Sequence, residues 1–199
     1  MERRERMQAA EPFYRALEII ARETAPTGAK WLIGGSAGLL LRGLELSDPP
    51  RDLDLYADDA AAAALHKALL PYAVDEQHES VSPIYRSVLS HYLIEGIQVE
   101  LVGGFVVSAG EDRYAVEVEK VLASLQTTVA IGAYQLGIVP LAHELWFNVL
   151  REREDRIRLI VPPIREEPAL HMEAVGVIAS GNRLTGKTKQ YVQQLLGNR

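Results

Sequence analysis

The chain has 199 residues, of which 48% are apolar and 24% charged, as in an ordinary folded protein of one domain with at most a small appendage. It contains no cysteine, which excludes disulfides and thiolate metal sites. A formal net charge of −6 makes duplex DNA an unlikely partner, but it is compatible with a small anionic ligand held through a metal ion. No apolar stretch is long enough for a membrane span and the charged N-terminus does not resemble a signal peptide, so we expect a soluble, cytoplasmic protein.

The first half of the chain alternates between helical and extended patterns. In chain order, the expected elements are a helix over 11–25, a strand over 31–33, a helix over 36–44, a strand over 52–56 and a helix over about 60–70. Asp58 precedes the last of these helices, and we expect its side chain to cap it.

In the second half, extended segments give way to helices. The expected elements are strands over 85–94 and 97–102 around a Glu95-Gly96 turn, strand-like runs within 116–139 around a turn at 130–135, a helix from 141 to about 160, and helices over 166–179 and 187–196. We expect Pro162-Pro163 to break the chain. This order predicts an α/β (mixed α+β) fold in which helices flank a small mixed sheet, with a core over 1–138 and a helical C-terminal region over 139–199.

Asp52 and Asp54 occupy one face of the strand expected over 52–56. Positions i and i+2 of a strand project to the same side, so the two carboxylates stand next to each other. At roughly 4–6 Å their repulsion is on the order of a few kcal/mol, and a bridging cation relieves it. Mg²⁺ is held by such carboxylates together with substrate phosphates. Taken alone, the pair is equally consistent with the solvated face of an edge strand.

The turn Gly34-Gly35-Ser36 follows an apolar strand and opens a helix. Backbone N–H groups and a hydroxyl in this position point at an anion, and the helix dipole favours its binding. Taken alone, such a turn is more often a plain connection between strand and helix. Together with the carboxylate pair on the next strand, it predicts a site for a metal-bound triphosphate.

Glu100 is a third candidate acid, in a strand where apolar and polar residues alternate. If this strand lies beside the Asp52–Asp54 strand, Glu100 joins the same face. It would then complete a metal shell or accept the proton of an attacking hydroxyl. The alternative is a glutamate that faces solvent on an antiparallel strand.

These residues resemble the signature of the nucleotidyltransferase superfamily, which has the polymerase-beta-like fold, in its stand-alone bacterial form. That signature is a Gly-Gly or Gly-Ser turn, an Asp-x-Asp strand and a later acid between apolar residues, and here it spans roughly residues 30–102. The resemblance implies a nucleoside triphosphate substrate whose phosphates bind at the Gly34–Ser36 turn. It also implies two Mg²⁺ ions, or Mn²⁺, at Asp52, Asp54 and Glu100.

The implied activity is the metal-dependent transfer of a nucleoside monophosphate from an NTP, such as ATP, to an unidentified acceptor. Relatives modify small molecules, RNA and proteins, and the sequence does not distinguish among these acceptors. Many relatives also carry a lysine near the position of Asn148, and this chain does not. The alternative hypothesis is therefore a catalytically degenerate nucleotide-binding module, or an interaction module of the toxin–antitoxin type.

Three further patterns are interpreted as structural. Residues 181–188 match the P-loop pattern, but too few residues follow for the rest of a P-loop sheet, so we expect a polar turn that caps a final helix. The charged run 151–156 is interpreted as a solvated helix face, in which Arg151 or Arg153 could still contact substrate. The five histidines lack metal-ligand spacing and are expected at the surface or in packing.

Overall fold

The computed structural model describes the backbone of residues 2–197 and the side chains of residues 11–197. Its helices are α1 (Glu2–Thr24), α2 (Gly35–Leu41), α3 (Asp59–Leu69), α4 (Leu141–Leu150), α5 (Glu154–Glu166), α6 (Pro168–Gly181) and α7 (Gly186–Leu195). Its strands are β1 (Trp31–Gly34), β2 (Asp52–Ala57), β3 (His78–Val81), β4 (Tyr85–Ile94), β5 (Ile97–Ala109), β6 (Asp112–Ala115), β7 (Thr127–Ile131) and β8 (Tyr134–Ile138). Three short 3₁₀ turns lie at Ala25–Thr27, Leu70–Tyr72 and Leu122–Ser124.

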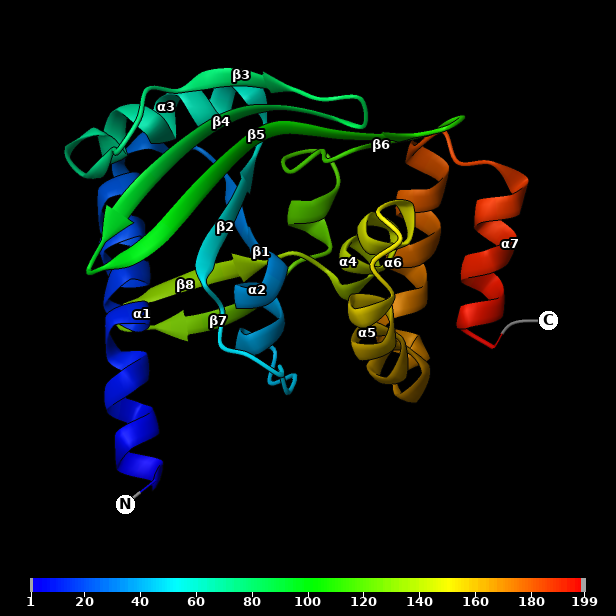
Figure 1. Ribbon diagram of the computed structural model, residues 1–199, viewed down its shortest axis with the longest axis horizontal. Coiled ribbons are helices and arrows are strands. Elements are labelled where there is room, and N and C mark those ends of the chain that lie inside the picture. The colour runs from blue at the N-terminus through cyan, green and yellow to red at the C-terminus, as the bar shows by residue number, and fades with distance from the viewer. Residues whose placement is uncertain (1, 198–199) are drawn as a thin grey trace.

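One mixed sheet contains all the strands, in the order β3-β4-β5-β2-β1-β8-β7, with β6 paired to β5. The strand β2 lies in the middle, antiparallel to β1 and parallel to β5. The predicted mixed sheet flanked by helices is therefore confirmed (Figure 1).

The two faces of β2 enter different parts of the core. Leu53 and Leu55 are buried in an apolar cluster with α1 and α3, whereas Tyr56 belongs to the cluster formed with α4–α7. The predicted alternation is confirmed, because Asp52 and Asp54 share the face of Tyr56 and point toward the helical half of the chain.

The predicted turn at Glu95-Gly96 is confirmed, since both residues have positive φ (53° and 78°) and join β4 to β5 as a tight hairpin. The predicted cap at Asp58 is wrong. Asp58 is the N-cap residue of α3 by position, but its side chain makes no capping hydrogen bond. Its carboxylate instead accepts hydrogen bonds from the backbone N–H groups of Val118 (2.9 Å) and Glu119 (3.0 Å). The Asp58 carboxylate oxygens therefore bind these distant amides and not the N–H groups of the first turn of α3.

The single helix expected from 141 to about 160 is two helices. After α4 ends, Glu152 adopts a left-handed conformation with φ +54°, and α5 begins at Glu154. Pro162 and Pro163 do not break the chain as expected, because both lie inside α5. The apolar face of α5 is buried in the core, and this packing outweighs the backbone hydrogen bonds that the prolines remove.

Among the described residues only helices follow β8, and they gather at one end of the sheet (Figure 1). The division of the chain into regions at residue 138 stays a prediction. Within residues 2–197, no helix combines the length and apolarity that a bilayer crossing requires.

Candidate functional site

The three candidate acids lie together on the sheet. In the strand register Gly34 is opposite Asp54, and Asp54 is opposite Glu100, so these residues form a row across β1, β2 and β5. Asp52, Asp54 and Glu100 each present one carboxylate oxygen such that the three oxygens lie within 4.8 Å of one another. The sequence-based expectation that Glu100 joins the face of the two aspartates therefore agrees with the structure.

These acids carry an electrostatic cost. Burial is the main cause that raises the pKa of Asp54 to about 7, and the carboxylates of Asp52 and Glu100 add to it. Burial likewise raises the pKa of Glu100. Neither Asp54 nor Glu100 accepts a hydrogen bond from another described side chain or backbone group. The group thus combines half-buried, mutually repelling oxygens that a cation would stabilise.

The donor set suits a hard divalent cation. All three candidate ligands are carboxylates, which is the chemistry that Mg²⁺ and Mn²⁺ select, and no thiol or imidazole belongs to the group. One or two carboxylates per ion leave room for phosphate oxygens. The residues present therefore fit a metal–phosphate site.

The glycine turn touches the acids directly. Gly35 has φ +57°, and a Cβ at this position would lie 1.9 Å from Oδ2 of Asp54. Only glycine tolerates both this conformation and this approach. A Cβ on Gly34 would similarly meet the ring of Tyr56 at 2.1 Å. The two sequence features, the glycine turn and the Asp-x-Asp strand, are thus parts of one packed structure.

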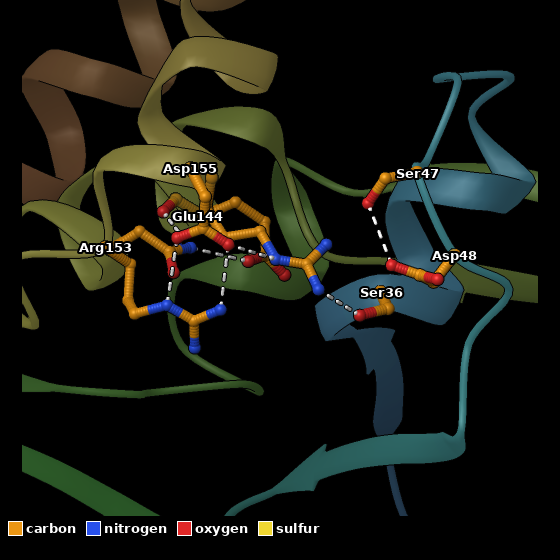
Figure 2. A network of polar contacts seen from close by, with 8 residues as sticks. Ser36, Ser47, Asp48, Glu144, Arg153 and Asp155 are labelled. Carbon is orange, nitrogen blue, oxygen red and sulfur yellow. Dashed lines mark hydrogen bonds and ion pairs between the residues drawn. The ribbon is translucent and has the colours of Figure 1, made fainter.

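The polar groups of the turn bind side chains from the helical half. The Gly35 N–H donates to Oε1 of Glu144 at 2.8 Å, and the Ser36 hydroxyl accepts from an Nη of Arg156 at 2.7 Å. Figure 2 shows Glu144, Arg153 and Asp155 on one side of this network and Ser36 on the other, with Arg153 paired to Asp155. The sequence singled out neither Glu144 nor Arg156 as a site residue.

A cavity of about 410 Å³ opens over the row of acids. Asp52, Asp54 and Glu100 line one wall, which we call the acid wall. Arg151, Arg153 and Arg156, which follow α4 in the chain, also line the cavity, and we call this part of the lining the arginine wall. Aromatic and apolar side chains complete the lining: Tyr56, Tyr85, Leu89, Val102, Phe105 and Phe147.

Arg151 is held against aromatic rings. Its guanidinium carbon lies 4.7 Å from the ring centre of Phe147 and 5.6 Å from that of Tyr85, and its Nε donates to the Tyr85 hydroxyl at 3.1 Å. The interpretation of 151–156 as one solvated helix face is wrong at Arg151, because the chain leaves α4 there and the side chain lines the cavity. Glu154 and Asp155, in the first turn of α5, are exposed as expected.

The segment that matches the P-loop pattern forms the expected polar turn. Gly181 ends helix α6, so a helix and not a strand precedes this turn, and Thr185 caps α7 by accepting from the Thr188 N–H at 3.3 Å. His143 is fully buried, with Nδ1 2.6 Å from the hydroxyl of Tyr114 and a ring that stacks on Phe147. Burial lowers the pKa of His143 to about 3, so it is a neutral packing residue at neutral pH.

No protein-family model and no curated protein matches this sequence. Among solved structures, a candidate nucleotidyltransferase from Thermotoga maritima is similar, with a TM-score of 0.59 and 16% identity over 77% of this chain and 93% of that one. ANT(2″)-Ia, solved with adenylyl-2″-tobramycin, has a TM-score of 0.47 and 14% identity over 92% of this chain and 95% of that one. The likeness to the Thermotoga maritima protein shows that this chain has a nucleotidyltransferase-like fold, as the sequence predicted.

Proposed function

We propose that this protein is a metal-dependent nucleotidyltransferase that moves a nucleoside monophosphate from an NTP to an acceptor hydroxyl. The observation that carries the proposal is the convergence of three carboxylates, without hydrogen-bond partners on Asp54 and Glu100, at the wall of a cavity that also holds a glycine turn and three arginines. The nucleotidyltransferase-like fold is consistent with it.

The proposed reaction is a displacement at the α-phosphorus. The acceptor oxygen forms a bond to the α-phosphorus as the bond to the bridging oxygen breaks, and the bond electrons leave with pyrophosphate. The acceptor proton passes to a carboxylate, for which Glu100 or Asp54 is placed at the acid wall.

Asp52, Asp54 and Glu100 would hold two Mg²⁺ ions, or Mn²⁺, and such ions supply charge neutralisation and polarisation of the phosphate when bound. The Gly34–Ser36 turn would bind phosphate oxygens through its backbone and the Ser36 hydroxyl. The arginine wall offers the positive charge that many relatives draw from a lysine near Asn148. We expect the protein to act in the cytoplasm, where NTPs and Mg²⁺ are available.

The test is thermal unfolding with each NTP, with and without Mg²⁺. A ligand at 100 times its dissociation constant adds about 2.7 kcal/mol to the free energy of unfolding, which raises the Tm of a chain of this size by several degrees. The Asp52→Asn/Asp54→Asn variant should lose this shift. A Glu166→Gln/Glu173→Gln variant is the matched control, since it makes the same charge change at exposed positions of α5 and α6. No Mg²⁺-dependent shift with any NTP would contradict the proposal.

A measurement of pyrophosphate release distinguishes nucleotide binding from nucleotidyl transfer. It is made in the presence of candidate acceptors: small molecules, RNA and proteins. An enzyme releases pyrophosphate only when an acceptor is present, and loses this activity in the Asp52→Asn/Asp54→Asn variant. A wild type that binds NTP at the acids without any release is a nucleotide-binding module instead.

A further inference from the structure

Glu144 occupies an unusual position for a carboxylate. It lies in the first turn of α4, is only 3% exposed and still contributes to the cavity lining. Its Oε1 accepts from the Gly35 N–H at 2.8 Å, and its Oε2 accepts from Nδ2 of Asn148 at 3.2 Å. A fourth acidic side chain thus sits beside the acid wall, bonded to the turn rather than grouped with Asp52, Asp54 and Glu100.

The charged carboxylate of Glu144 is electrostatically unfavourable at this position when no nucleotide is bound. The negative charge of Glu144 is one of the causes that raise the pKa of Asp54, so the two carboxylates repel each other. Burial is also unfavourable for the charged form of Glu144 itself, against which the Gly35 N–H and Arg151 act. The favourable contacts of Glu144 are those that an oxyanion of a nucleotide would make at the same place: a backbone N–H of the turn and nearby guanidinium groups.

The Gly35 N–H cannot serve both partners. A backbone N–H provides one donor, and the proposed function assigns the donors of this turn to a phosphate. In this structure that donor already has a carboxylate oxygen at a normal hydrogen-bond distance. A phosphate oxygen therefore reaches Gly35 only if the carboxylate leaves.

We infer that Glu144 is an exchangeable internal ligand, which holds the Gly35 N–H in the nucleotide-free protein and releases it to a phosphate oxygen when nucleotide binds. This inference rests on the proposed function. Asn148 makes the exchange feasible, because it bonds the other carboxylate oxygen and can keep it as the side chain rotates away from Gly35. Glu144 then lowers nucleotide affinity, since each nucleotide must displace it.

Affinity measurements on two variants test the exchange. Glu144→Gln keeps an acceptor for Gly35 but removes the charge, which weakens the competing hydrogen bond. Glu144→Ala removes the acceptor altogether. The dissociation constants of ATP, GTP, CTP and UTP are measured with Mg²⁺ by calorimetry, and Glu173→Gln is the control for a unit charge change at an exposed site.

We expect Glu144→Gln to bind its preferred nucleotide about tenfold more tightly than the wild type does, and Glu173→Gln to match the wild type. If Glu144→Ala folds, it should also bind nucleotide more tightly than the wild type does. If it does not fold, the affinity of Glu144→Gln alone tests the exchange. Unchanged or weaker nucleotide binding by Glu144→Gln overturns the inference. It would show that the hydrogen bond between Glu144 and Gly35 is a permanent contact between α4 and the turn.

A direct readout of the donor complements the affinities. The ¹⁵N–¹H resonance of Gly35 should differ between wild type and Glu144→Gln, and should move in the wild type when Mg²⁺ and nucleotide are added. If nucleotide binds in an Asp52- and Asp54-dependent manner while the Gly35 resonance stays in place, only the exchange fails. If no nucleotide binds to the wild type or to Glu144→Gln, the proposed function fails with it.

Discussion

The charged side chains on the two walls of the cavity differ in whether they have hydrogen-bond partners within the protein. On the arginine wall each guanidinium has a partner within the protein: Arg153 binds Asp155, Arg156 binds Ser36 and Arg151 binds the Tyr85 hydroxyl. On the acid wall, Asp54 and Glu100 have none among the described residues. The charge of Arg151 opposes the rise in the pKa of Asp54 and of Glu100 only in part, so the acids still repel one another in the metal-free protein. A cation held among the three carboxylates would relieve this repulsion.

The largest effect is expected on metal binding. Asp52→Asn/Asp54→Asn removes two of the three candidate ligands, so Mn²⁺ affinity should fall at least about a thousandfold, or roughly 4 kcal/mol. Mn²⁺ titration followed by electron paramagnetic resonance measures this directly. Glu166→Gln/Glu173→Gln should retain the wild-type affinity, and a similar loss in that control would mean that the acid wall is not the metal site.

The next effect concerns the contact between the turn and the acid wall. Gly35→Ala combines a left-handed backbone with a Cβ 1.9 Å from the Asp54 carboxylate, so we expect it to lower the free energy of unfolding by about 3 kcal/mol. Gly28→Ala is the matched control, because Gly28 has φ +64° but no atom within 4 Å of the new Cβ. Urea denaturation should show that Gly28→Ala lowers the free energy of unfolding by only about 1 kcal/mol. Equal losses would show that the approach to Asp54 does not matter.

The acid wall should also make stability depend on pH. The pKa of Asp54 is about 7 in the folded protein against its ordinary 3.8, so between these values the folded chain binds more protons than the unfolded chain. Stability should therefore fall as pH rises, by on the order of 2 kcal/mol from about pH 5 to about pH 7 without divalent metal.

Asp54→Asn removes the titrating group, so it should flatten this pH dependence and be more stable than the wild type near pH 8. Urea denaturation across the pH range measures both effects. Identical pH profiles for wild type and Asp54→Asn would contradict the assignment of this pH dependence to Asp54.

The smallest effect is expected on the arginine wall. Arg153 lowers the pKa of Asp155 to about 2, but the two side chains are 44% and 62% exposed, so solvent screens the pair. Asp155→Asn should change the free energy of unfolding by no more than about 0.5 kcal/mol, and in the destabilising direction. The same chemical change thus has opposite signs on the two walls. Stabilisation by Asp155→Asn would remove the contrast between them.

The acid wall was predictable because its pattern is local. Alternation along one strand places Asp52 and Asp54 on one face, and the glycines before α2 mark the turn beside them. Glu100 required one further assumption, that β5 lies next to β2, and the strand register agrees with it. The nucleotidyltransferase-like fold followed from these same residues.

Glu144 and Arg156 were not predictable in this way. Glu144 meets Gly35 across 109 positions, and Arg156 meets Ser36 across 120, so both contacts depend on how α4 and α5 pack against the turn. Local rules also failed where packing or distant amides prevailed. The prolines of α5 stay in a helix because the apolar face of α5 is buried. The Asp58 carboxylate accepts hydrogen bonds from the N–H groups of Val118 and Glu119 instead of capping its own helix.

The position of the two walls in the chain has a consequence for synthesis. A nascent chain that has left the ribosome only as far as β8 contains the glycine turn and all three acids, with β2 already able to pair with β1 and β5. It lacks Glu144 and every residue of the arginine wall. The arginine wall is therefore the last part of the cavity to be made, and the acids stay exposed until α4 and α5 emerge and cover them.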